Sequence, residues 1–192
     1  MSLDKGFDKI FASGKSIEDQ AKLVEGMYRG NTLGILEAFK NGFIDFAQAK
    51  ELIAMSLDKG FDRIFNSGKT INDQAKLVEG MYRGNTLGIL EAFKNGFIDF
   101  AQAKELMVLS LNGGFDKILN SNLSPESQSN LLRGVYEGTA RGIADAVKNG
   151  LDANIGKQLM AAGFEVLFER IANLTAARQE TLVRAAFEGV GN

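Results

Sequence analysis

The sequence contains no cysteine, no histidine and no tryptophan. Without cysteine the chain can form no disulfide and offers no thiolate nucleophile, and without histidine it lacks the most frequent general base. The common structural zinc sites are excluded as well, because they use these two residue types. An enzyme would have to work with carboxylates, amines and hydroxyls alone. We therefore expect a non-enzymatic protein without catalytic residues or a cofactor.

Strong charge and long apolar runs are also missing. Lys and Arg total 22 against 24 Asp and Glu, and the two signs alternate along the chain. A nucleic-acid-binding face would be basic, so we expect no nucleic-acid partner. No apolar run approaches the 18 residues of a membrane helix, and the opening MSLDKGFDKI has no apolar stretch of a secretory signal. These features predict a cytoplasmic protein with no membrane partner.

A tandem repeat of 54 residues dominates the sequence. Residues 1–54 and 55–108 differ at six positions, and residues 19–52 recur unchanged as 73–106. A diverged third copy begins at Leu109. A partial fourth copy follows, in which LVRAAFEG at 182–189 matches LVEGMYRG at 23–30.

Each copy of the repeat is predicted to form two helices. One is capped by Ser16, shows apolar residues at the 3.6-residue period and ends before Gly42. The other starts at Asp45, which forms a capping box with Gln48, and runs to about Ser67. The fold class is therefore all-α, a single domain over 1–192. Its tandem helical hairpins would lie at about 1–42, 43–96, 97–150 and 151–192.

The near-perfect copy also predicts how the hairpins pack. Each unit must accept an identical unit in a head-to-tail contact. This requirement favours a short α-solenoid-like stack, in which a further unit fits easily, over the alternative of a closed helical bundle.

The longer helix of the first three copies carries three glycines spaced four residues apart, on the border of its apolar face. Each glycine costs about 1 kcal/mol relative to alanine inside a helix, so another backbone is expected to come close to this face. The predicted helix-packing glycines are Gly26, Gly30, Gly34, Gly80, Gly84, Gly88, Gly134, Gly138 and Gly142.

Polar residues occupy the middle of the same apolar face. Asn31 and Asn85 are equivalent, and Thr139 takes their place in the third copy. A buried polar group needs a hydrogen-bond partner. We therefore expect these residues either to bond across to a neighbouring helix and fix the repeat register, or to line a polar pocket.

Three further positions vary between copies in an informative way. Glu25 and Arg29 stand four residues apart, and the third copy reverses their signs as Arg133 and Glu137. A catalytic carboxylate could not be exchanged in this way, so we expect either a surface ion pair or an inter-repeat contact. The tyrosine of the first three copies becomes Phe187 in the fourth. This predicts a core aromatic position that keeps the ring rather than the hydroxyl.

The stretch EAFKNGFIDFAQ at 37–48 resembles the calcium-binding loop of the EF-hand family, with Gly42 at the turn. It departs from that pattern at the ligands, because Phe39 takes the third position and Gln48 replaces the closing acid. We therefore predict no metal site. We interpret the segment as a helix C-cap followed by the N-cap of Asp45.

The leading functional hypothesis is a module for protein or peptide interaction or scaffolding, since repeat arrays commonly bind along extended faces. One alternative is a purely structural product of a natural or engineered duplication with no dedicated ligand. Another is binding of a hydrophobic small molecule or lipid in a cavity lined by Phe39, Phe46 and Asn31. The sequence predicts neither a particular partner nor an oligomeric state.

Overall fold

The computed structural model describes residues 3–191, which form eight α-helices and no strand. The helices are α1 (Leu3–Phe11), α2 (Ile17–Lys40), α3 (Phe46–Phe65), α4 (Ile71–Lys94), α5 (Phe100–Leu119), α6 (Pro125–Lys148), α7 (Ala153–Ile171) and α8 (Ala176–Gly191). They pair into four hairpins, α1–α2, α3–α4, α5–α6 and α7–α8, which are referred to below as units one to four.

The segment at 37–48 has the predicted capping geometry. Gly42 follows the end of α2 with a φ of +75°, a conformation that favours glycine. The Asp45 side chain accepts a hydrogen bond from the backbone of Gln48 at 2.8 Å, and the Gln48 side chain accepts one from the backbone of Asp45 at 2.9 Å. The segment is thus a sharp link between two helices.

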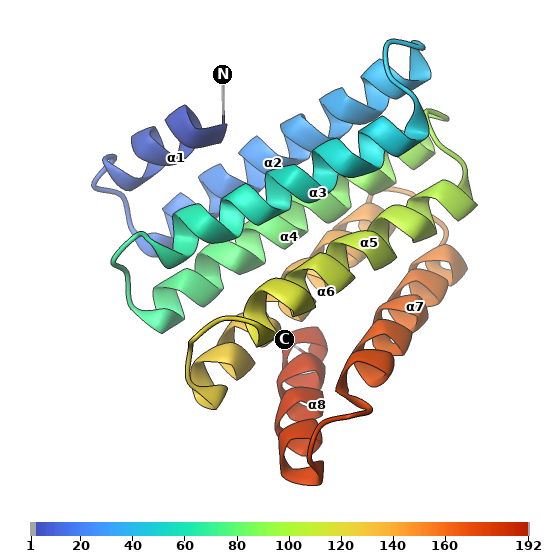
Figure 1. The fold of residues 1–192 in the computed structure, drawn as a ribbon. Helices are drawn as coiled ribbons and strands as arrows, with labels where there is room; N and C mark the ends of the chain where they lie inside the picture. Colours follow the sequence, from blue (N-terminus) through green and yellow to red (C-terminus); the bar gives the residue numbers. More distant parts are fainter. Residues whose placement is uncertain (1–2, 192) are drawn as a thin grey trace.

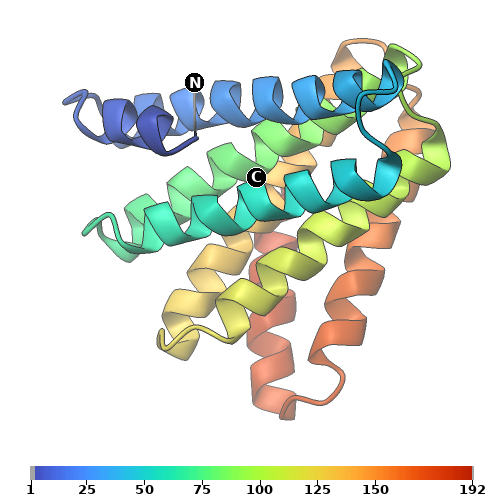
Figure 2. The same cartoon turned by 45° about the horizontal axis from the view of Figure 1, so that its top comes forward.

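The helices alternate between two layers (Figure 1). The inner layer consists of α2, α4, α6 and α8, and the outer layer of α1, α3, α5 and α7, each helix touching its neighbours in the same layer. Figure 2 shows the successive hairpins fanning out from one end of the molecule. Within residues 3–191 units one and four make no contact with each other. The array is therefore an open solenoid-like stack, and the closed bundle is not formed.

A single hydrophobic core runs through the stack, from Phe7 in α1 to Ala186 in α8. Three tyrosines, Tyr28, Tyr82 and Tyr136, are among the largest fully buried side chains. The terminal helices α1 and α8 have 9 and 16 residues, fewer than the 19 to 24 of the other helices. No helix within residues 3–191 has the length and apolar character needed to cross a bilayer.

Candidate functional site

Successive units meet through two faces of the inner-layer helices. The leading face of unit two is the side of α4 that carries Gly80, Gly84 and Gly88, and it contacts the trailing face of α2. A methyl group on Gly84 would overlap the carbonyl oxygen of Glu25, and one on Gly88 would lie 2.9 Å from that of Arg29. These helices pack backbone against backbone, which no larger residue permits.

The same contact recurs further along the stack. Methyl groups on Gly134 and Gly138 of α6 would meet the carbonyl oxygens of Ala75 and Glu79 on α4. Gly142 lies against the side chain of Thr86 in the same interface. The glycines of units two and three therefore lie between neighbouring helices, in the close contact that their four-residue spacing predicted.

The glycines of unit one differ from this expectation. A methyl group on Gly26, Gly30 or Gly34 would meet nothing within 4 Å. The reason is that no described helix lies against this side of α2. The leading face of unit one is therefore open, although its residues are the same as those that α4 buries.

The polar residues of the apolar face are also bonded in unit two and without a partner in unit one. The hydroxyl of Thr32 donates to Oδ1 of Asn85 at 2.8 Å, and Nδ2 of Asn85 donates to the hydroxyl of Ser110 at 3.0 Å. Asn85 is fully buried and thus joins units one, two and three. Thr139 is buried too, but its hydroxyl donates to a carbonyl of its own helix.

Asn31, the equivalent of Asn85 in unit one, is only half-buried. Its Nδ2 atom is nevertheless shielded from solvent and has no hydrogen-bond partner. An orphaned buried amide is unfavourable, by about 1–3 kcal/mol. Contact with a hydrogen-bond acceptor at this face would remove that cost.

The tyrosines also connect consecutive units. The phenol of Tyr28 donates to the carbonyl of Ser56 at 2.8 Å, and Tyr82 and Tyr136 make the same contact with the next units at 2.9 and 2.7 Å. The prediction of a core aromatic is confirmed, because all three tyrosines are buried, and the hydroxyl adds a bond between units that the prediction left out. Phe187 has no hydroxyl, and it is 53% exposed on the trailing face of unit four.

Ion pairs join the units at the edges of these faces. Arg83 pairs with Glu25 at 3.3 Å on one side and with Asp145 at 2.6 Å on the other, and Arg29 pairs with Glu91 at 2.8 Å. Of the two interpretations of the pair formed by Glu25 and Arg29, the structure supports the inter-repeat contact, because each residue pairs with a charge of unit two. The hydrogen bond to Glu91 raises the pKa of Arg29 above its ordinary value.

Arg141 is an interface residue that the repeat pattern did not predict. It pairs with Glu79 of unit two and with Glu137 of its own helix, both at 2.7 Å. Units one and two have leucines at this position, Leu33 and Leu87. The reversed charge pair was the available signal. Glu137 replaces the arginine that would pair with Glu79, so Glu79 needs a cation from another position, and Arg141 supplies it.

The open leading face of unit one forms one side of a groove of about 720 Å³ between α1 and α2. In unit two the equivalent space is filled, because the phenol of Tyr28 lies against Gly60 and Met81. Gly6 and Met27 are the counterparts of these two residues and line the empty groove. The groove is thus the place that a tyrosine of a preceding unit would occupy.

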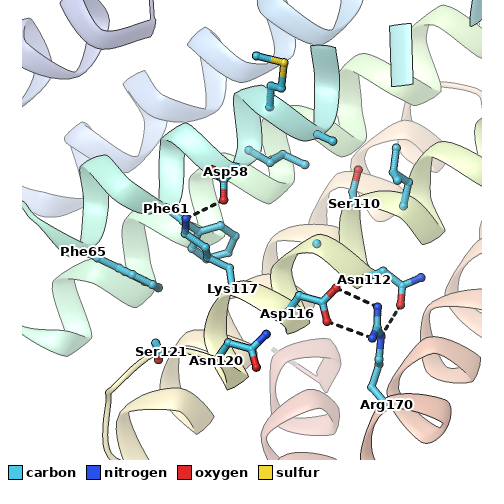
Figure 3. A pocket seen from close by; sticks show the side chains of 15 residues that line it. Asp58, Phe61, Phe65, Ser110, Asn112, Asp116, Lys117, Asn120, Ser121 and Arg170 are labelled. Atoms are coloured by element: carbon cyan, nitrogen blue, oxygen red, sulfur yellow. Dashed lines mark hydrogen bonds and ion pairs between the residues drawn. The ribbon is translucent and has the colours of Figure 1, made fainter. Parts of the chain in front are cut away.

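A second groove, of about 960 Å³, lies between α3 and α5 on the outer layer (Figure 3). Phe61 forms part of its apolar floor. Lys117 pairs with Asp58 at 2.7 Å and Arg170 with Asp116 at 3.0 Å along the rim. These charged groups satisfy one another, so the groove offers mainly apolar surface.

The three residues expected to line an apolar ligand cavity are not brought together. Phe39 and Phe46 pack on each other at the turn between α2 and α3, with ring centroids 5.5 Å apart. Neither ring lines the groove that Asn31 faces.

No protein-family model matches the sequence, and no curated protein is detectably similar to it.

Proposed function

We propose that the chain is a non-enzymatic helical-repeat module of the cytoplasm that binds a helical segment of another protein at the leading face of unit one. One observation carries the proposal. The residues of this face are identical to those of the α4 face, which buries a neighbouring helix against Gly80, Gly84 and Gly88.

The state of this face supports the same proposal. Its glycine backbone is open, its groove is unfilled and the Nδ2 atom of Asn31 has no partner. Leu23, at the edge of the groove, is 42% exposed. A bound helix would cover this apolar surface and supply the missing contacts.

Affinity capture with matched variants tests the proposal. Gly30→Leu fills the leading face, whereas Gly113→Leu fills the outer groove, and a Cβ added at either glycine meets no atom within 4 Å. We expect a protein from the producing cells to be retained by the wild-type chain and by Gly113→Leu, and lost with Gly30→Leu. Equal retention by all three chains, or no retained protein at all, would refute the proposed function.

A second candidate is a purely structural product of tandem duplication, and the 34 unchanged residues at 19–52 and 73–106 favour it. A selected binding surface usually differs between neighbouring units. The coding DNA tests this alternative. Matching synonymous codons in the two segments would support a recent or constructed duplication, and many synonymous differences would contradict it.

A further inference from the structure

The contact between units one and two specifies what a leading face accepts. The helix that α4 receives has a small residue, Ala21, where the two backbones come close. One turn later Glu25 pairs with Arg83, and after another turn Arg29 pairs with Glu91. The accepted helix thus carries a small residue, an acid and a base at intervals of four.

Two more features complete this contact. Tyr28, directly before the base, enters the groove over Gly60 and donates its hydroxyl proton to the carbonyl of Ser56. In the outer layer Asp8 pairs with Arg63, so the helix preceding the accepted one contributes an acid. The two helices of a hairpin therefore both take part in recognition.

Unit one repeats this leading face, and no helix within residues 3–191 lies against it. Arg29 and Glu37 hold the positions of Arg83 and Glu91, and Lys9 holds that of Arg63. We infer that the face docks a helical hairpin of matching chemistry. Its contact helix has a small residue, Glu and Arg at four-residue spacing with Tyr directly before the Arg, and its other helix has an acid facing Lys9. This inference rests on the proposed function, for which it names the class of partner.

The final trailing face of the chain does not have this chemistry. Glu180 replaces the small residue, Arg184 replaces the acid and Glu188 replaces the base. On the leading face of another copy, Arg184 would face Arg29 and Glu188 would face Glu37. Like charges in these places disfavour head-to-tail association of copies. The leading face of unit one therefore binds a different protein rather than a second copy of this chain.

A variant with corrected contacts tests this recognition rule with the whole chain. It combines Glu180→Ala, Arg184→Glu, Phe187→Tyr and Glu188→Arg, all at exposed positions. These changes give opposite charges at both contacts, restore the small residue and supply the tyrosine. We expect sedimentation velocity to show concentration-dependent head-to-tail assembly, with a Kd at least about tenfold lower than that of any self-association of the wild-type chain.

Two controls locate the contact. Adding Gly30→Leu to the corrected variant should return it to monomers, and adding Gly113→Leu should leave the assembly intact. A corrected variant that stays monomeric with unchanged helix content would overturn the inference, as would assembly that survives Gly30→Leu. If capture depends on Gly30 while the corrected variant does not associate, the partner chemistry is wrong and the proposed function still stands.

Discussion

Alanine at two equivalent glycines, Gly30 and Gly84, should change stability in opposite directions. Both lie in the same local sequence, so each substitution brings the same intrinsic helix gain of about 1 kcal/mol. At Gly30 the new methyl group meets no atom within 4 Å, and this gain should be realised. At Gly84 the methyl group overlaps the carbonyl oxygen of Glu25, a backbone atom that cannot rotate away.

Overpacking of this kind typically costs about 1–3 kcal/mol, and separating α2 from α4 would also loosen the contacts of Gly80 and Gly88. We therefore expect Gly84→Ala to lower the free energy of unfolding by about 2 kcal/mol and Gly30→Ala to raise it. Urea unfolding followed by circular dichroism measures both. Effects of the same sign and similar size would refute the claim that unit one presents an open copy of a buried face.

Three further matched comparisons follow from the unit contacts. Tyr82→Phe should cost about 1 kcal/mol through loss of the buried bond to Ser110, whereas Phe187→Tyr should change urea stability little; equal effects would contradict the contact. Asn85→Ala should cost about 2 kcal/mol, whereas Asn31→Ala should raise stability because it removes a buried amide without a partner, and a large loss at Asn31 would show an unrecognised partner. Burial raises the pKa of all three tyrosines, so stability should fall as the pH rises above the ordinary phenol pKa of about 10. Phenolate absorbance and helix signal should then change together, and phenol ionisation with the helices intact would contradict this.

The helices and their pairing into stacked hairpins followed from the sequence, because the caps at Asp45 and Gly42 and the 54-residue period are local signals. The ends of the array were harder to predict. Identical residues were expected to behave identically, yet Gly30 is open and Gly84 is buried, since the environment depends on the neighbouring unit. The phenol of Tyr82 was undervalued for the same reason, because its counterpart Phe187 is exposed whereas Tyr82 is buried against the next unit.

Arg141 could be interpreted only with the interface in view. Its role depends on Glu79, which lies 62 positions earlier in the sequence and whose residue is 5% exposed. Periodicity identifies which residues share a helix face, but it does not say which charge of one helix meets which charge of the next. The pairing of charges between faces is visible only in the three-dimensional structure.

The self-compatible contact between units one and two has a consequence for the length of the array. A face that fits its own copy adds the same rotation and rise each time, so nothing at this junction limits the number of copies. The limit comes from the diverged units, where Arg141 fits unit three to unit two and Glu180 makes the last face unsuitable for another copy. A change in the number of copies of this segment in the gene would therefore lengthen or shorten the array by whole units.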